Sequence, residues 1–163
     1  MNDVSDHTLS PAQFLAHWQG HRQLTRQVIE AFPDDQLFAY HALDMRTFGE
    51  LANEIHEITE YTVSGLLTDE WREPDPDDAD SFGGLNDKAA LLAAWDALTA
   101  RLDREFLSVP SSRFAETRRL FWGEKTGLGW ALYALDNEIH HRGQGYVYLR
   151  ELGVKPPDFF ARP

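Results

Sequence analysis

Hydrophobic residues recur along the chain at the spacing of an α-helix in four segments. Apolar side chains at i, i+3, i+4 and i+7 share one helix face, which packs against a core. The first segment carries Phe14, Trp18, Val28 and Phe32 in this way before Pro33 ends it. The pattern predicts four helices, at about residues 11–32, 47–67, 87–109 and 126–152.

Residues at the ends of these segments support the predicted boundaries. Ser10 followed by Pro11 is typical of a helix N-terminus, because serine caps free N–H groups and proline fits the first turn. Thr47 and Glu50 have the spacing of a capping box. Gly153 stands where a glycine commonly ends a helix.

An acidic stretch separates the second predicted helix from the third. Seven of the twelve residues in 69–80 are Asp or Glu and two are Pro, which is typical of a solvated loop. We expect a long crossover loop here, with a lid over the bundle end as the alternative. Residues 112–125 allow either a short extended piece or an irregular connection. The order of elements predicts an all-α four-helix bundle in a single domain, 1–163.

Composition narrows the classes of function. A formal net charge of −12 opposes nucleic-acid binding, because phosphates repel such a surface. The absence of cysteine excludes disulfides, thiolate nucleophiles and cysteine-type zinc sites. No apolar run approaches the roughly 20 residues of a membrane span, and the N-terminus has no signal-peptide pattern. We therefore expect a cytoplasmic protein that binds neither nucleic acid nor membrane.

The last predicted helix is interrupted by polar residues. In 136–144, eight of nine residues are polar, charged or glycine, and apolar runs flank them on both sides. Burying an unpaired polar group costs roughly 1–3 kcal/mol by mutational estimates. These groups therefore either face water or converge on a site.

One face of this helix carries candidate ligands. Asn137, His141, Gln144 and Tyr148 follow the spacing i, i+4, i+7, i+11 and so lie on the same side. His141 is the natural metal ligand, whereas an asparagine carbonyl is a weaker one. His140 points about 100° away, so we expect the two histidines not to share one ion easily. Structural hydrogen bonding and an interface are the alternatives to a metal or catalytic site.

Facing helices would have to supply further ligands to such a site. Glu54 lies at the edge of the apolar stripe of the second helix and is an inward candidate, with a surface carboxylate as the alternative. His56 is expected to face solvent. On the first helix, His17 and His21 are spaced i, i+4, which makes His21 a weaker candidate ligand.

Two further residues of the polar stretch have structural explanations. Arg142 follows Glu138 at i+4, the favourable order for an ion pair on a helix. Gly143 costs roughly 1 kcal/mol against alanine inside a helix, which suggests the close approach of another backbone, from a neighbouring helix or from a second subunit.

Two motifs resemble the DinB/YfiT-like family. The C-terminal one reads NEIHHRGQ at 137–144, VYLR at 147–150 and LGVKPP at 152–157, and the other reads MRTFGEL at 45–51. The resemblance implies a bundle of four main helices, a homodimer and a metalloprotein. It also implies a thiol-dependent transferase or isomerase that uses a low-molecular-weight thiol. The family name refers to DNA damage, which implies a stress response and not DNA binding.

The chain departs from the family pattern at the metal ligands. One histidine of the second helix and a His-x-x-x-His pair of the last helix are matched here by Glu54, Asn137 and His141. The resemblance implies that these three hold a divalent ion (Zn, Ni, Fe or Mn), in an oxygen-richer and weaker site than three imidazoles give. If the metal is lost, Glu54 would bond to Asn137 or His141.

Two functions of different classes remain. The first is a metal-dependent enzyme that acts on a small molecule, a thiol-dependent transferase in the most concrete form, with His140, Arg142 and Gln144 as candidate catalytic or substrate-binding residues. The second is a non-catalytic bundle with a degenerate metal site, which serves as a dimeric ligand-binding or structural protein.

Overall fold

A computed structural model describes residues 9–72 and 84–161 and has four long helices. These are α1 (Pro11–Ala31), α2 (Phe48–Thr68), α3 (Lys88–Glu105) and α5 (Gly127–Glu151). Between α3 and α5 lie the 3-10 turn η1 (Phe106–Ser108), the short helix α4 (Ser111–Ala115) and two strands, β1 (Thr117–Leu120) and β2 (Gly123–Thr126). The predicted four-helix bundle is confirmed, and the undecided segment 112–125 forms a short helix and a hairpin.

The helix ends follow the capping residues of the sequence. Ser10 accepts a hydrogen bond from Gln13 N, and the Gln13 side chain accepts one from Ser10 N. Thr47 and Glu50 form the same reciprocal box at the start of α2. Gly153 adopts φ +75°, as a residue that ends a helix in the left-handed region does. Local sequence therefore fixes where the long helices begin and end.

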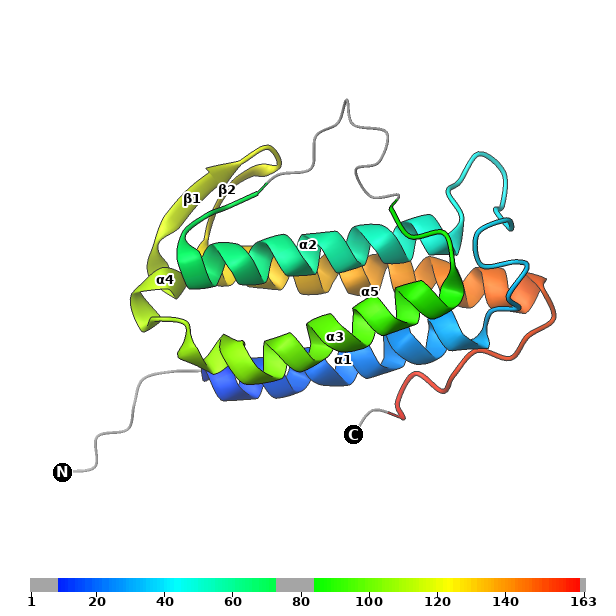
Figure 1. Cartoon of the computed structure of the whole chain (residues 1–163), viewed down its shortest axis with the longest axis horizontal. Coiled ribbons are helices and arrows are strands. Elements are labelled where there is room, and N and C mark those ends of the chain that lie inside the picture. Colours follow the sequence, from blue (N-terminus) through cyan, green and yellow to red (C-terminus); the bar gives the residue numbers. More distant parts are fainter. Residues whose placement is uncertain (1–8, 73–83, 162–163) are drawn as a thin grey trace.

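The four helices are not arranged up and down in sequence order. α1 and α5 run in one direction, and α2 and α3 run in the other (Figure 1). α5 packs against both α1 and α2, so it joins the two halves of the bundle. α2 ends and α3 begins at opposite ends of the molecule. Residues 73–83 of the acidic stretch lie outside the described residues, so the crossover loop and the lid stay predictions.

The core has two apolar parts with a polar layer between them. One part contains Phe14, Trp18, Phe106 and Leu135, and the other contains Val28, Phe48, Trp95 and Leu149 among its members. The buried polar residues of α1 and α5 fall in sequence between these two parts: His21, Arg22, Thr25, Glu138, His141 and Arg142. A bundle of this kind must satisfy its polar groups internally.

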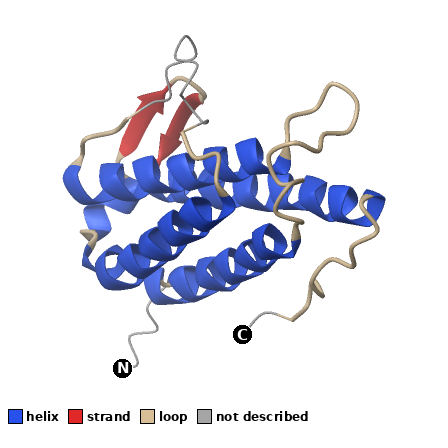
Figure 2. Ribbon diagram, turned by 45° about the vertical axis from the view of Figure 1, so that its right-hand side comes forward, coloured by secondary structure: helices blue, strands red, loops and turns tan. Residues whose placement is uncertain are grey.

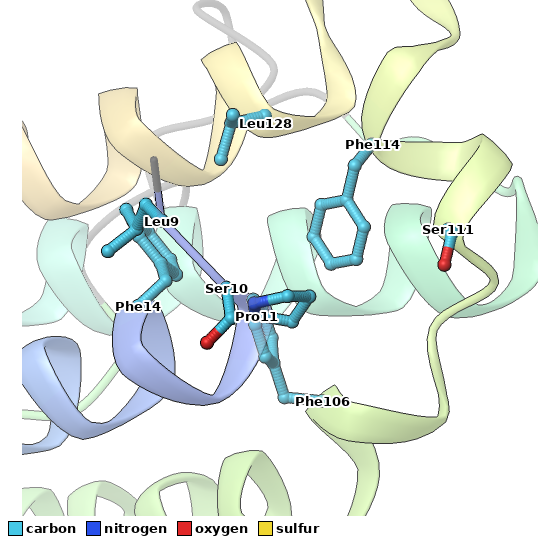
Figure 3. A pocket seen from close by; sticks show the side chains of 8 residues that line it. All are labelled: Leu9, Ser10, Pro11, Phe14, Phe106, Ser111, Phe114 and Leu128. Atoms are coloured by element: carbon cyan, nitrogen blue, oxygen red, sulfur yellow. The ribbon is translucent and has the colours of Figure 1, made fainter. Parts of the chain in front are cut away.

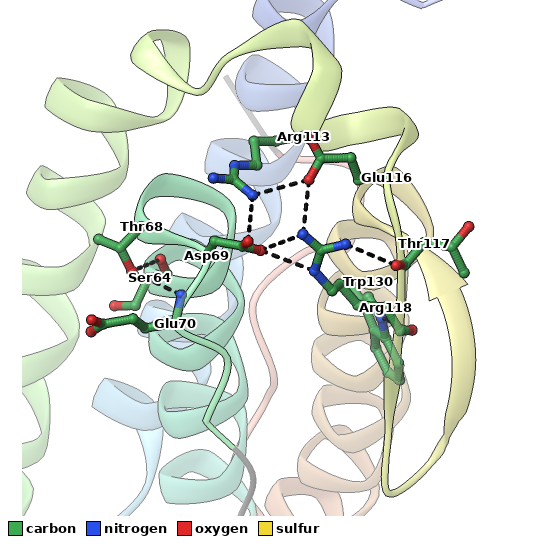
Figure 4. Close-up of polar contacts among 9 residues, drawn as sticks. All are labelled: Ser64, Thr68, Asp69, Glu70, Arg113, Glu116, Thr117, Arg118 and Trp130. Atoms are coloured by element: carbon green, nitrogen blue, oxygen red, sulfur yellow. Dashed lines mark hydrogen bonds and ion pairs between the residues drawn. The ribbon is translucent and has the colours of Figure 1, made fainter.

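An ion-pair cluster holds the hairpin against the end of α2. The hairpin projects from one end of the bundle, as Figure 2 shows. Asp69 caps α2 with φ +66°, and its carboxylate lies 2.8 Å from Arg113 and 2.6 Å from Arg118. Glu116 contacts the same two guanidinium groups at 3.0 and 2.9 Å (Figure 4). These tertiary contacts, rather than an apolar alternation, fix the two short strands.

No neighbouring helix among the described residues makes the expected close approach at Gly143, and the approach of a second subunit stays a prediction. A Cβ built at Gly143 has no neighbouring atom within 4 Å, whereas one built at Gly145 would overlap the Phe48 ring. The backbone of α5 comes close to α2 at Gly145, two residues further along.

Candidate functional site

Glu54 of α2 meets Asn137 and His141 of α5, and we call these three side chains the α2–α5 trio. Asn137 Nδ2 donates to Glu54 Oε1 at 2.9 Å, and His141 Nε2 lies 3.0 Å from the same oxygen. The side chains of His141 and Glu54 are 9% and 13% exposed, so the trio lies just beneath the surface. The sequence-predicted ligands therefore come together, and Glu54 bonds to both partners.

The Glu54 carboxylate is surrounded by donors. Its second oxygen, Oε2, lies 2.6 Å from a guanidinium nitrogen of Arg46, in the loop before α2. Burial raises the pKa of Glu54, but hydrogen bonds from His141 and Asn137 and the charge environment outweigh it, and the net pKa is lowered to about 2. Glu54 is therefore a carboxylate over the whole physiological pH range.

Gln144 orients the His141 ring from its other side. Gln144 Nε2 lies 3.2 Å from His141 Nδ1 and 3.1 Å from His140 Nε2. With the amide nitrogen in this position, Nδ1 of His141 accepts and Nε2 donates to Glu54. The two adjacent imidazoles reach the same amide group although they start about 100° apart on the helix. His140 itself is exposed.

A second polar group lies on the adjacent face of α5, about 100° round the helix and next to α1, and we call it the α1–α5 network. Thr25 donates to Glu138 Oε1 at 2.6 Å and accepts from Arg142 Nη1 at 3.1 Å. Arg142 Nη2 contacts His21 Nδ1 at 2.8 Å, and Nη1 donates to the His21 carbonyl at 3.2 Å. Arg142 and Glu138 are 3% and 0% exposed. The Glu138–Arg142 pair, with 3.9 Å between Oε1 and Nη1, is therefore buried, and the network keeps Arg142 away from solvent.

His21 and His56 differ from their sequence-based expectations. Both ring nitrogens of His21 are engaged, Nδ1 with Arg142 and Nε2 with His17 at 3.2 Å, so the ring belongs to the α1–α5 network. His56 was expected to face solvent, but it is half-buried with Nε2 3.3 Å from the Ala94 carbonyl. Burial lowers its pKa, and the charge of Arg22 adds to this effect.

Sequence reasoning missed Arg22, which is fully buried between α1 and α3. Its Nε donates to Thr99 at 2.8 Å, and its guanidinium lies 4.1 Å from the centre of the Trp95 ring. Burial lowers the pKa of Arg22 to about 10, although Glu138 and Asp96 raise it. Polar residues that interrupt the apolar stripes of both α1 and α5 were the available signal for this layer.

The fit of a metal ion to the trio depends on Asn137. Among the residues described, no three His, Cys, Asp or Glu side chains are grouped so that they could hold an ion. The trio offers one carboxylate, one imidazole and the Asn137 Oδ1, which is buried and has no hydrogen-bond partner in the described chain. An amide turned by 180° would aim this oxygen at Glu54. The residues therefore fit a divalent ion through two ordinary ligands and one weak one.

An apolar cavity lies between the start of α1, η1, α4 and the start of α5. It measures about 230 Å³ and is lined by Leu9, Ser10, Pro11, Phe14, Phe106, Ser111, Phe114 and Leu128. Figure 3 shows the side chains of Phe14, Phe106, Phe114 and Leu128 around it. Its lining, as far as the structure describes it, includes no titratable side chain, so it offers no acid–base or metal chemistry.

These features define a helical bundle with a polar site between its second and last long helices. The family model of the DinB family matches residues 1–162, and the chain belongs to this family. No curated protein sequence matches the chain. That Glu54, Asn137 and His141 replace three histidines of the family pattern stays a prediction.

Three solved structures share the fold. A DinB-like protein from Bacillus cereus is 18% identical with a TM-score of 0.70, over 91% of this chain and 97% of the other. The DinB-like protein YjoA of Bacillus subtilis is 20% identical with a TM-score of 0.71, over 92% and 98%. YfiT of Bacillus subtilis, described as "a probable metal-dependent hydrolase with an unusual four-helix bundle topology", is 16% identical with a TM-score of 0.69, over 94% and 93%. At these identities the likeness concerns the fold alone.

None of the helices in residues 9–72 and 84–161 is both long and apolar enough to cross a bilayer.

Proposed function

We propose that this chain is a cytoplasmic metal-dependent enzyme of the DinB family that acts on a small molecule. Glu54 and His141 would be the principal ligands and Asn137 the third. The observation that carries the proposal is the convergence of Asn137 Nδ2 and His141 Nε2 on Glu54 Oε1, at 2.9 and 3.0 Å. The description of YfiT as a probable metal-dependent hydrolase agrees with it.

The side chains around the trio support this role. Glu54 stays ionised, as its low pKa requires, and provides the negative charge that a cation needs. For His141 to bind through Nε2, its proton must move to Nδ1, and the Gln144 amide must turn so that its oxygen accepts it. Gln144 is therefore the residue that selects the His141 tautomer.

The ion, when bound, would act as a Lewis acid that lowers the pKa of a coordinated nucleophile, either a thiol or water. A transferase that uses a low-molecular-weight thiol is the concrete form that the resemblance favours, and it implies a role in stress response. Exposed His140 and half-buried Gln144 are the candidates for substrate contact. Arg142 is not, because its guanidinium is buried in the α1–α5 network.

The direct test is the metal content of protein purified without a polyhistidine tag. We expect near-stoichiometric metal in the parent and in His140→Ala, an imidazole lost from the same helix one residue away. Glu54→Ala and His141→Ala should both lose it. Parent protein that stays empty after metal supplementation would overturn the proposal.

A second candidate function follows from the same contacts. Glu54, Asn137 and His141 already pair with one another, as a non-catalytic bundle that serves as a structural or ligand-binding protein would require. This alternative predicts no bound metal and a lower melting temperature for His141→Ala. This alternative fails if His141→Ala has the same melting temperature as the parent and loses only an activity.

We further propose a homodimer through the outer face of α5. Leu132, Ile139 and Val147 on this face are exposed, and Gly143 leaves open space beside them. Ile139→Asp should convert the dimer to a monomer in sedimentation measurements, whereas Phe160→Asp at the exposed C-terminal segment should not. A parent protein that is monomeric at all concentrations would rule the dimer out.

A further inference from the structure

The apolar cavity of Figure 3, which we call the phenylalanine cavity, has a buried floor and an exposed rim. Phe14 and Phe106 line it and are almost fully buried, so their rings belong to the core as well as to the cavity. Leu9 and Leu128 also line it, but both side chains are exposed. The cavity therefore opens to solvent between these two leucines, and a small molecule can enter without displacing a wall.

The volume of the phenylalanine cavity suits one small ring system. It measures about 230 Å³. An apolar cavity of about 150 Å³, lined by Leu, Ile and Phe, binds benzene and otherwise stays dry. The phenylalanine cavity is about half as large again, so one substituted ring or two fused rings would fit. A bound helix would instead need a row of anchor sites along a groove, whereas the eight lining residues surround a single cavity.

The walls favour an aromatic ring that carries no charge. The ring centre of Phe106 lies 5.8 Å from that of Phe14 and 5.6 Å from that of Phe114. Aromatic rings attract a further ring at such separations, by edge or by offset face. The lining residues include no titratable side chain, although 26% of the chain is charged. A charged ligand would therefore lose hydration in the cavity without gaining a counter-charge.

Two serine hydroxyl groups in the lining do not change this preference. Ser10 Oγ already accepts a hydrogen bond from Gln13 N, at 3.2 Å, as the cap of α1. Ser111, at the start of α4, is exposed and can keep its hydroxyl group in water. The cavity can therefore tolerate a small polar substituent at its rim, but it does not require one.

We propose that the phenylalanine cavity is a binding site for a neutral aromatic molecule of one or two rings. The ligand lies against Phe14, Phe106 and Phe114, and a polar substituent points to the rim near Ser111. This site goes beyond the proposed function, because it uses no residue of the α2–α5 trio. The ligand would contact α1, η1, α4 and α5 together, so binding should raise the melting temperature of the protein.

The test measures binding of toluene to the full chain by titration calorimetry. We expect a Kd of about 1 mM or lower, and benzoate and benzylammonium should bind at least about tenfold more weakly. Benzyl alcohol should bind about threefold more tightly than cyclohexylmethanol, which has the same hydroxyl group on a saturated ring. The proposal is overturned if toluene does not bind, if a charged compound binds as tightly, or if the two alcohols bind equally.

Variants locate the binding site. Ser111→Trp places an indole ring in the cavity and should weaken toluene binding at least about tenfold. Ser112→Trp is the matched control, because Ser112 is equally exposed on α4 but does not line the cavity. Phe114→Ala makes room for a further ring and should shift the preference from toluene toward 2-naphthol about tenfold, a gain that misfolding would not produce. Equal losses in Ser111→Trp and Ser112→Trp would refute the site.

The same assay separates this site from the metal site. Glu54→Ala lacks a metal ligand but keeps every residue that lines the cavity, so toluene should bind it as it binds the parent. A parent that takes up no metal but binds toluene removes the metal-dependent function and leaves this site. A metal-loaded parent that does not bind toluene does the reverse. Loss of toluene binding in Glu54→Ala would place the ligand at the trio and refute the cavity.

Discussion

One face of α5 contacts Glu54 of α2 and the adjacent face carries Glu138, and the pKa values of the two carboxyl groups are shifted in opposite directions. Glu54, from α2, receives hydrogen bonds from Asn137 and His141 near the surface, and its pKa is lowered to about 2. Glu138, in the α1–α5 network, is fully buried, and burial raises its pKa despite Arg22 and Thr25. Hydrogen-bond donors and nearby charge lower the pKa of Glu54 more than burial raises it, whereas burial dominates the pKa of Glu138. An ionised carboxylate near the surface suits metal binding or catalysis, whereas a fully buried one mainly connects helices.

Removing a charge from the buried α1–α5 network should have the largest effect on stability. Arg142→Met removes the guanidinium that contacts Thr25 and His21 and lies 3.9 Å from the buried Glu138 carboxylate, and we expect a loss of about 3–5 kcal/mol of stability. Urea unfolding measures it. Arg150→Met, on the same helix but exposed, should change stability by less than about 0.5 kcal/mol. Equal effects of both substitutions would contradict the comparison.

The α2–α5 trio should contribute less to stability than the α1–α5 network does. Glu54→Ala removes the acceptor of Asn137 and His141, and we expect a loss of about 1–3 kcal/mol in metal-free protein. Glu124→Ala in the exposed hairpin is the control and should be neutral in the same urea titration. A loss as large as that of Arg142→Met would remove the distinction between the two faces.

The pH dependence should have opposite signs on the two faces. The contribution of Glu54, with its lowered pKa, is present above the ordinary pKa of 4.5 and is lost as pH falls toward about 2. Glu138, with its raised pKa, contributes most below 4.5 and loses its contribution as pH rises through its folded pKa. The stability difference between the parent and Glu54→Gln should therefore shrink on acidification from pH 5 to 3. That between the parent and Glu138→Gln should shrink on raising the pH from 5 to 8, and parallel slopes would refute this contrast.

A substitution on the outer face of α5 should have the smallest effect on stability. Gly143→Ala meets open space and should stabilise the monomer by up to about 1 kcal/mol, the helix propensity difference. Gly145→Ala is the contrast, because its methyl group would overlap Phe48 and should destabilise the fold. Thermal melting at low protein concentration compares the two. A destabilising Gly143→Ala would mean that the outer face is packed.

Sequence alone predicted the long helices and the meeting of Glu54 with Asn137 and His141. Caps and apolar periodicity are local signals, and the family motif supplied the pairing between α2 and α5. The burial of Arg142 was not predictable, since an i, i+4 ion pair with Glu138 looks the same on a surface and in a core. The hairpin was not predictable either, because its position depends on the contact of Arg118 with Asp69, which lies 49 residues earlier.

The parallel pairing of the first and last long helices has a consequence for synthesis. Thr25 leaves the ribosome 113 residues before Glu138, and His21 leaves it 121 residues before Arg142. Until then α1 must carry hydroxyl and imidazole groups whose native partners have not yet been made. A nascent chain that stalls before α5 therefore exposes these groups, and the emergence of α5 joins the two halves of the bundle.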